Sequence, residues 1–234
     1  MGAISTQKLR SYTGPRKDVI GLVQQPPRRI LDLGCSDGSL GAALMDVYDA
    51  AEVHGVEYDL SFVETARGRL ASVIQADLNT GDLTGFPQDV DLLICADVLE
   101  HTIQPLENLK TILAKCTTED AYVILSLPNV QHITVILNLF RGIWPERDRG
   151  IFDRTHLRWF TLKSIYDMAE AADLEVQILR RNFRLADRSG GKLNRYAKYF
   201  AYLPLKNFFT YQYVVLLKRR RNSELGDASR SADL

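Results

Sequence analysis

The chain is poor in the residues that build metal clusters and disulfide frameworks. It has three cysteines and four histidines among 234 residues. Cys35, Cys95 and Cys116 are an odd set without metal-type spacing, and each lies in or beside an apolar segment. This usage favours a reducing compartment over a disulfide scaffold. We therefore expect a cytoplasmic protein whose cysteines are free.

An excess of charge and long apolar runs are also missing. The 29 basic residues balance the 29 acidic ones, which excludes bulk attraction to nucleic acid or to an anionic membrane, so we expect no sequence-specific nucleic-acid partner. No apolar run reaches the roughly 18 to 20 residues that cross a bilayer, and the N-terminus has no signal core. With 46% hydrophobic and 25% charged residues, the composition is that of a soluble globular protein.

Strand-like apolar segments alternate with segments of helical spacing along most of the chain. The expected strands cover 29–34, 52–57, 72–76, 90–96, 121–127, 174–181 and 211–218, and the expected helices 40–48, 60–70, 106–115, 132–140 and 162–172. This alternation predicts an α/β fold, with a Rossmann-like, mostly parallel sheet of seven strands and helices on both faces. The last two strands are expected to form an antiparallel pair at the sheet edge.

We expect one main domain over residues 28–218, with shorter segments at its ends. Residues 1–27 are interpreted as a helical leader, and the polar residues 219–234 as a disordered tail. Within the domain, the charged and aromatic loop 142–160 is predicted to form a lid over the substrate.

Residues 185–210 form an aromatic and basic insertion, in which Leu193, Tyr196 and Phe200 recur at helical spacing. Such a helix packs on the sheet edge or on a second subunit, which would make the protein a homodimer. The alternative is a basic amphipathic face that contacts a membrane surface or a lipid-linked saccharide.

The segment from Asp32 to Gly38 places Gly34 and Gly38 where a strand must turn sharply into a helix. An ordinary tight turn has the same composition. Glu57, however, ends the next strand about 20 residues further on, where an acidic side chain reaches ribose hydroxyls in nucleotide-binding Rossmann folds. Asp77 follows the third strand, where an acid can meet an adenine amino group. Asp32 lies inside a strand end, where an unpaired carboxylate is costly unless it holds backbone N–H groups or a cationic ligand.

With these residues the chain resembles the class I S-adenosylmethionine-dependent methyltransferases, from about residue 28 to about residue 218. The resemblance implies S-adenosylmethionine as the cofactor. The residues that it implies around this cofactor are Asp32, Gly34, Cys35, Ser36, Gly38, Glu57, Tyr58, Asp77, Leu78, Ala96 and Asp97. Ser36 stands where the family usually has a middle glycine, so we expect a slight adjustment of the loop. The order Gly, Ser, Gly lacks the dinucleotide spacing, which disfavours a dehydrogenase.

Methyl transfer is an in-line displacement, so the protein mainly positions the nucleophile and removes its proton. Candidate bases are His132, His156, His101 and Asp97, whereas His54 lies inside a strand and is interpreted as structural. His132 follows the fifth strand; its alternative interpretation is an exposed helix start.

The segment from Asp97 to His101 gathers two carboxylates and an imidazole after the fourth strand. It is either a turn with a helix cap or a metal site. It resembles the acidic and histidine cluster of some ubiquinone-biosynthesis and RNA-end O-methyltransferases. That resemblance implies Asp97, Glu100 and His101 as Mg²⁺ ligands.

The lid segment from Asp153 to Phe160 combines an acid, two guanidiniums, an imidazole and aromatic rings. These groups suit a hydroxyl-rich or phosphorylated substrate, and the alternative is a salt-bridged connection. With the segment 127–132, the lid resembles MetW-like and, more closely, polysaccharide-cluster methyltransferases.

The resemblance of the lid implies a sugar or glycan hydroxyl as the acceptor. It also implies that Asp153, Arg154 and Arg158 bind the substrate and that His132 or His156 is the base. The alternatives are a small-metabolite or RNA-end methyltransferase, and a MetW-like partner that binds the cofactor and regulates another enzyme.

Overall fold

The computed structural model describes residues 14–49, 51–185 and 205–220, and its centre is a seven-stranded sheet. The strands are β1 (Arg29–Leu33), β2 (Glu52–Glu57), β3 (Ser72–Gln75), β4 (Val90–Ala96), β5 (Thr117–Pro128), β6 (Leu174–Phe183) and β7 (Thr210–Arg219). Their order in the sheet is β3-β2-β1-β4-β5-β7-β6. The first five strands are parallel, and β7 is antiparallel to both β5 and β6. The predicted fold class and the antiparallel pair are confirmed.

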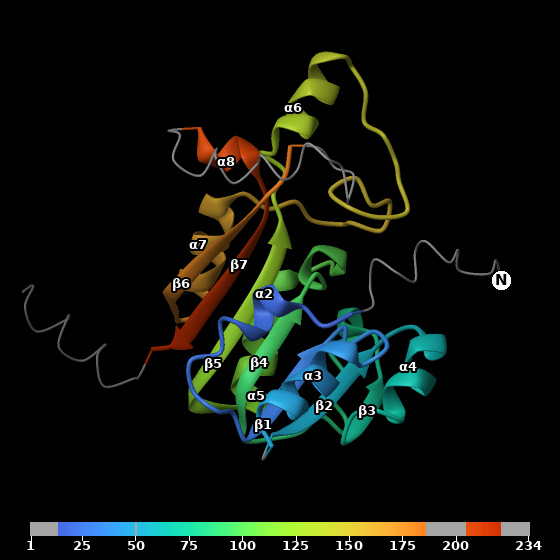
Figure 1. Cartoon of the computed structure of the whole chain (residues 1–234), viewed down its shortest axis with the longest axis vertical. Helices are drawn as coiled ribbons and strands as arrows, with labels where there is room; N and C mark the ends of the chain where they lie inside the picture. The colour runs from blue at the N-terminus through green and yellow to red at the C-terminus, as the bar shows by residue number, and fades with distance from the viewer. Residues whose placement is uncertain (1–13, 50, 186–204, 221–234) are drawn as a thin grey trace, which may run out of the picture.

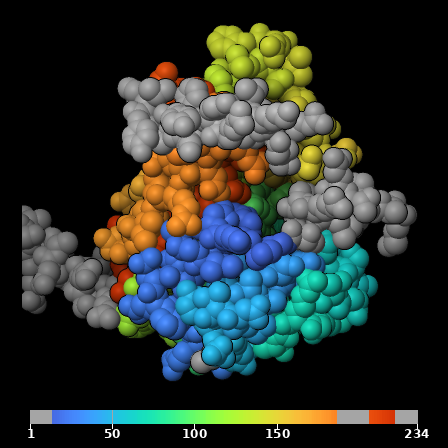
Figure 2. Space-filling view, in the orientation of Figure 1, coloured from blue at the N-terminus to red at the C-terminus, as the bar shows by residue number. Residues whose placement is uncertain are grey.

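Helices cover both faces of this sheet (Figure 1). They are α2 (Lys17–Ile20), α3 (Ser39–Val47), α4 (Leu60–Arg67), α5 (Pro105–Cys116), α6 (Ile133–Phe140), α7 (Leu162–Ala171) and α8 (Lys206–Phe209), with the 3₁₀ turns η1 (Leu78–Thr80) and η2 (Leu99–His101). Side chains of α5 and α7 pack on one face, and those of α2, α3 and α4 on the other. Figure 2 shows the blue surface of α2 and α3 over this second face.

Alternation along the central strands explains the two layers. In β4, Leu92 and Ile94 belong to the core under α3, whereas Leu93 and Cys95 belong to the core under α5 and α7. Successive side chains of a strand point to opposite faces, so a strand that is apolar at every position fits only between two helical layers.

The strand order reverses between β1 and β4, because the chain proceeds from β1 to β2 and β3 on one side and from β4 to β5 on the other. In open α/β sheets this switch point is where ligands bind, beyond the carboxyl ends of the strands. The loops after β1, β2 and β4 therefore meet at one place.

Several boundaries differ from the prediction. Helix α4 ends at Arg67, because Gly68 is its C-cap, and a glycine inside a helix costs about 1 kcal/mol relative to alanine. Strand β5 begins at Thr117, earlier than expected. Arg219 ends β7 and so belongs to the sheet, not to the predicted tail.

Three predicted segments fall largely on parts of the chain outside the described residues: the leader before residue 14, the insertion over 186–204 and the tail beyond residue 220. Residues 141–161 connect α6 to α7 without a helix or strand of their own, as the lid prediction requires. Among the described residues, none of the helices has the length and apolar character needed to cross a membrane.

Candidate active site

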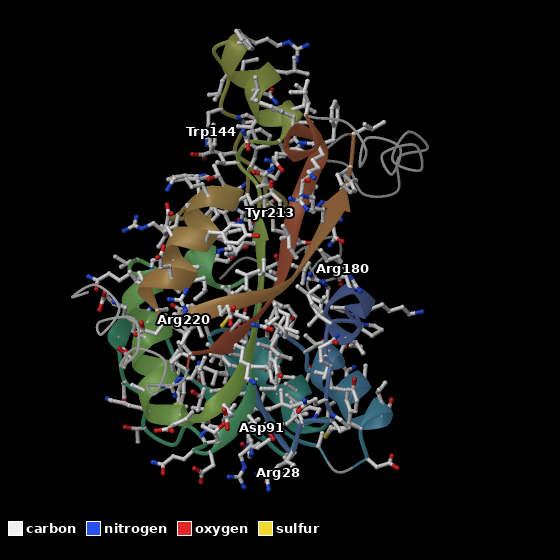
Figure 3. All side chains as sticks on the ribbon, turned by 90° about the vertical axis from the view of Figure 1, so that its left-hand side faces the viewer. Arg28, Asp91, Trp144, Arg180, Tyr213 and Arg220 are labelled. Atoms are coloured by element: carbon white, nitrogen blue, oxygen red, sulfur yellow. The ribbon has the colours of Figure 1, made fainter. Side chains whose placement is uncertain are left out.

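A cavity of about 510 Å³ opens where β1, β2 and β4 end. The predicted site residues that line it are Gly34, Ser36, Glu57, Tyr58, Asp77, Leu78, Asp97 and His101. A second hollow, of about 350 Å³, lies beside Arg28 and Asp91. Figure 3 labels these two residues at the end of the molecule opposite Trp144. They lie at the amino ends of β1 and β4, where sheets of this kind do not bind ligands.

The loop between β1 and α3 has three residues with left-handed backbone: Gly34 (φ 65°), Ser36 (φ 51°) and Gly38 (φ 78°). A Cβ on Gly34 would lie 2.9 Å from Cγ2 of Val98, so this position needs glycine for space as well as for conformation. Ser36 adopts the conformation of the glycine that it replaces. Its hydroxyl is buried and has no hydrogen-bond partner among the described residues.

Glu57 ties this loop to the end of β2. Its Oε2 accepts from the Ser36 N–H at 2.8 Å, and its Oε1 accepts from the N–H groups of Tyr58 and Asp59, both at 2.9 Å. A carboxylate offers about four lone-pair positions, so about one remains for a ribose hydroxyl.

The opposite wall carries Asp77 and Leu78. The Asp77 carboxylate accepts from the Asn79 N–H at 2.9 Å and caps η1. The Asn79 side chain in turn accepts from the N–H of Ile103 at 2.7 Å, which connects this wall to the loop after β4. Asn79 lines the cavity as well.

Asp32 is buried, with 2% of its surface exposed, and its Oδ2 has no hydrogen-bond partner among the described residues. Burial, together with the nearby charge of Glu57, raises the pKa of this carboxyl to about 7. An orphaned carboxylate oxygen beside the loop fits a ligand that carries positive charge, as S-adenosylmethionine does at its sulfonium and ammonium groups.

Besides Asp32, three predicted cofactor residues do not line the cavity. The Cys35 thiol lies in the core under α3 and α4, so close to Gly55 that a Cβ there would be 2.5 Å from its sulfur. Gly38 caps the start of α3 against Ala66 of α4, and Ala96 packs into the same core as Cys35. The side chains of Cys35 and Ala96 thus point into the helical layer, and Gly38 packs against it.

Asp97 follows β4 with a left-handed backbone (φ 59°) and lines the cavity. Its carboxylate accepts from Arg16 Nη1 at 2.5 Å, from Gln212 Nε2 at 2.6 Å and from Ser126 Oγ at 3.2 Å. A carboxylate held by three donors is poorly suited to take a proton, which argues against Asp97 as the base. Arg16 and Gln212 come from segments far from Asp97 in the chain, so no local sequence motif predicts that they contact it.

His101 is the predicted histidine that lines the cavity. The Thr155 hydroxyl donates to Asp153 Oδ1 at 2.6 Å, so its oxygen can accept from His101 Nδ1, 3.0 Å away. The Thr155 carbonyl lies 3.2 Å from the same nitrogen. His101 Nδ1 thus carries the proton, and Nε2 has the free lone pair.

His156 lies behind His101, with ring centroids 4.8 Å apart. Burial and the neighbouring His101 lower its pKa. His132 is fully buried at the start of α6, with ring nitrogens 2.8 Å from the Arg184 carbonyl and 2.9 Å from Thr134 Oγ1. Neither histidine lines the cavity, so the geometry does not support either as the base that contacts the substrate.

The predicted metal set needs a correction. The group whose ligand atoms all lie within 4.8 Å of one another is Glu100, His101 and His156, without Asp97. Asp97 is engaged by Arg16 instead. Glu100 is 1% exposed, and its Oε2 has no hydrogen-bond partner among the described residues. Two imidazoles and one carboxylate suit a transition metal better than Mg²⁺, which prefers oxygen ligands.

The lid is fastened to the loop after β4. Backbone N–H groups of Leu157 and Arg158 donate to the Glu100 carbonyl at 2.8 and 3.0 Å, and the Arg158 side chain donates to the Ile103 carbonyl. Arg154 pairs with Asp148 at 2.7 Å. Asp153, Arg154 and Arg158, predicted to bind substrate, therefore support the lid, and Thr155 is the lid residue that lines the cavity.

Comparison with known proteins agrees with this arrangement. Residues 8–178 match the model of a family described as a methyltransferase domain. The chain belongs to this family. Its fold is the class I, Rossmann-like fold of S-adenosylmethionine-dependent methyltransferases.

Solved structures share the fold over most of their length. A methyltransferase from Thermotoga maritima is 13% identical, with a TM-score of 0.60 over 87% of each chain. One from Aquifex aeolicus is 14% identical, with a TM-score of 0.59 over 93% of this chain and 100% of its own.

Curated relatives match over shorter stretches. A trans-aconitate 2-methyltransferase of Rhizobium etli is 33% identical over 91 residues, which is 38% of this chain and 34% of that protein. The corresponding Rhizobium leguminosarum protein is 35% identical over 71 residues, 29% of this chain and 28% of its own. The chain thus matches about a third of the length of these relatives.

Proposed function

We propose that this methyltransferase transfers the methyl group to a hydroxyl oxygen, with His101 as the general base. The observation that carries the proposal is the hydrogen-bond chain from Asp153 through Thr155 to His101 at the cavity wall. A base that is oriented by a second group through its far nitrogen is the arrangement that proton abstraction requires. Nε2 of His101 would accept the hydroxyl proton as the carbon–oxygen bond forms and the methyl carbon–sulfur bond breaks, which would leave S-adenosylhomocysteine.

S-adenosylmethionine supplies an electrophilic methyl group on a sulfonium. In our proposal Glu57 binds the ribose hydroxyls, and Asp77 with Leu78 frames the adenine. Asp32 and the orphaned Ser36 hydroxyl lie in or beside the loop that would meet the methionine portion. The fold holds each of these carboxylates and the Ser36 hydroxyl in place, and each has hydrogen-bonding capacity left for a ligand.

A sugar or glycan hydroxyl is the acceptor that we favour, on the resemblance of the lid sequence. The names of the curated relatives support a second candidate, a small carboxylic acid. RNA ends and other small metabolites, and a regulatory role with cofactor binding alone, are separate outcomes of the experiment below. The predicted homodimer and membrane contact depend on the insertion, most of which lies outside the described residues, and stay predictions.

A divalent cation held by Glu100, His101 and His156 is the alternative use of the same histidine. The donor set fits such an ion, because the orphaned Glu100 oxygen and both imidazoles lie together. His156 Nδ1 lies 3.3 Å from the Ile151 carbonyl, and a hydrogen bond there would orient the ring so that its other nitrogen could face the ion. A cation there would polarise the acceptor hydroxyl.

The experiment measures transfer of labelled methyl from S-adenosylmethionine to fractionated cell extract, oligosaccharides and trans-aconitate. We expect His101→Gln and Thr155→Val to lower kcat, the first by roughly 10² to 10⁴-fold, with little change in cofactor affinity. His54→Gln is the matched control, since His54 lies in β2 and contacts Ser72 instead of the cavity. Full activity in His101→Gln would exclude the base.

The acceptor and the metal are decided separately. Label only in protein or RNA fractions would exclude the glycan, label in trans-aconitate alone would establish the acid, and cofactor binding without any transfer would favour the regulatory role. If EDTA abolishes the wild-type activity and Mn²⁺ or Zn²⁺ restores it, and if neither ion restores activity in Glu100→Gln, then His101 acts as a metal ligand and not as the general base.

A further inference from the structure

The segment before the first strand contacts a cavity residue, Asp97, through the side chain of Arg16. Arg16 precedes α2, and its guanidinium lies at the carboxyl ends of β4 and β5 and at the amino end of β7. It donates to Asp97 after β4 at 2.5 Å, to Ser126 of β5 at 2.9 Å and, at 3.5 Å, to Gln212 of β7. The family's cofactor loop plays no part in these contacts.

Asp97 is a residue that needs such support. Its left-handed backbone (φ 59°) is strained in a residue other than glycine and persists only where the surroundings hold it. Its carboxylate accepts hydrogen bonds from three segments. Oδ1 accepts from Ser126 of β5 and Gln212 of β7, and Oδ2 accepts from Arg16. Within the described residues, Arg16 is the cation that forms an ion pair with it.

Arg16 is itself fixed in place. Asp18 accepts from its guanidinium at 2.9 and 3.0 Å, and Asn182 of β6 donates to Asp18 at 2.7 Å. Arg180 of β6 donates to the Asp18 carbonyl at 2.7 Å, and Figure 3 shows this side chain pointing toward α2. Figure 2 shows the blue N-terminal segment against the orange surface of β6. Because Asp18 already holds the guanidinium of Arg16, this side chain loses little further conformational entropy when it also binds Asp97.

We propose that Arg16 is a positioning residue of the methyltransferase, which holds the Asp97 carboxylate and the backbone turn after β4 in the shape that the cofactor cavity requires. The N-terminal segment is then part of the cofactor site as well as a cover of the sheet. Burial opposes the charge of Arg16, but the charges of Asp97 and Asp18 keep its pKa above the ordinary value. The guanidinium of Arg16 therefore stays charged at neutral pH.

The alternative is that Arg16 only anchors the N-terminal segment. An anchor contributes to the free energy of unfolding, whereas a positioning residue also changes the affinity for the cofactor in protein that is fully folded. These two quantities can be measured independently, and S-adenosylhomocysteine is the probe of choice. Its sulfur is uncharged, so the negative charge freed on Asp97 by loss of Arg16 would not attract a sulfonium and mask the effect.

The test is a double-mutant cycle of Arg16→Gln and Asp97→Asn, with Kd for S-adenosylhomocysteine measured by calorimetry below the melting temperature of each variant. We expect Arg16→Gln to weaken binding at least about tenfold, since one partner of a half-buried charge pair is removed. The double variant should bind about as weakly as Asp97→Asn alone, because Arg16 acts through Asp97. Arg16→Lys should restore part of the affinity.

Arg67→Gln is the matched control. Arg67 ends α4 and pairs with Glu64 at 3.0 Å on the exposed surface, so its neutralisation should leave Kd unchanged. If Arg16→Gln lowers the melting temperature but binds S-adenosylhomocysteine as the wild type does, Arg16 is an anchor and the proposal fails. The proposal also fails if the effects of Arg16→Gln and Asp97→Asn on the free energy of binding are additive in the double variant, since additivity would show that Arg16 does not act through Asp97. Full methyl transfer by His101→Gln would contradict the proposed base, but it would leave this inference standing, because the inference is tested by cofactor affinity alone.

Discussion

Ser36 shows how a single residue departs from a family pattern without losing the structure that the pattern serves. The usual glycine is replaced, yet the backbone keeps a left-handed conformation (φ 51°), because Glu57 holds the Ser36 N–H from the next strand. The strain is compensated by a hydrogen bond across the loop. The serine hydroxyl is then left buried beside the cofactor position.

Replacing Ser36 by glycine should stabilise the protein by about 1 kcal/mol, because glycine has no steric penalty at this φ. In a chain of this size that corresponds to a rise in Tm of about 2 to 4 °C, measurable by calorimetry. Ser36→Ala is the control, since it removes the hydroxyl and keeps the strain, and it should not raise Tm. If both variants weaken cofactor binding equally, the hydroxyl contacts the cofactor.

Asp32 predicts an unusual pH dependence of stability. Its pKa is about 7 in the folded protein and about 4 in an unfolded chain. Between these values the native state holds a proton that the unfolded state has released, so the free energy of unfolding should fall as pH rises from about 5 to 7.5, by about 2 kcal/mol. Urea unfolding at several pH values measures this.

Asp32→Asn removes the ionisable group and should abolish that part of the slope. A wild-type slope identical to that of Asp32→Asn would show that the carboxyl titrates normally. Bound cofactor should reduce the wild-type slope, because a cation beside Asp32 favours the ionised carboxylate.

At the scale of elements, the close approach of β2 to the loop after β1 depends on Gly55. A Cβ there would lie 2.5 Å from the Cys35 sulfur and 2.9 Å from Cδ1 of Leu70. The sequence prediction treated Cys35 as a cofactor contact and gave Gly55 no role. The thiol instead fills the space above that glycine, so that β2 and the loop share one packed layer.

Gly55→Ala should therefore destabilise the protein by about 1 to 3 kcal/mol, the usual cost of overpacking. Gly68→Ala is the matched control, because the nearest atom to its Cβ would be 3.6 Å away and its backbone is helical. That substitution should be neutral or slightly stabilising. Chemical denaturation of the two variants decides the point, and equal stabilities would contradict the packing argument.

The charged residues of the lid contact other residues of the protein, whereas the sequence predicted that they would contact the substrate. Its charged residues were expected to bind substrate, but Asp153 orients Thr155, Arg154 pairs with Asp148, and Arg158 binds a backbone carbonyl. The salt-bridged connection that the sequence left open describes the lid better. Pairing between charged neighbours within one loop satisfies them before a substrate arrives.

At the scale of the whole molecule, the cavity between the strand ends should couple cofactor binding to stability. Saturation with S-adenosylhomocysteine at about 100 times its Kd adds about 2.7 kcal/mol, which corresponds to a rise in Tm of about 5 to 10 °C. NAD⁺ should give no rise, because the loop lacks the dinucleotide spacing. A shift with NAD⁺, or a full shift with S-adenosylhomocysteine in Glu57→Ala, would contradict the assigned site.

Local patterns of the sequence determined the strand and helix alternation, the sharp turn at Gly34 and the position of Glu57 at the end of the second strand. Each is a property of neighbouring residues, set by steric limits on the backbone or by the two-residue period of a buried strand. From these alone follow the fold class and the glycine loop and strand end that line one side of the cavity.

Only the tertiary structure decided what surrounds the reacting groups. Arg16 and Asp97 are 81 residues apart in the chain, and His101 and Thr155 are 54 apart. Contacts of this kind form because loops from several strands converge at one edge of the sheet, and no local spacing encodes which side chains will meet there. The sequence thus predicted which strand ends form the cavity, whereas packing places His101 at its wall, buries His132 away from it and pairs Asp97 with Arg16.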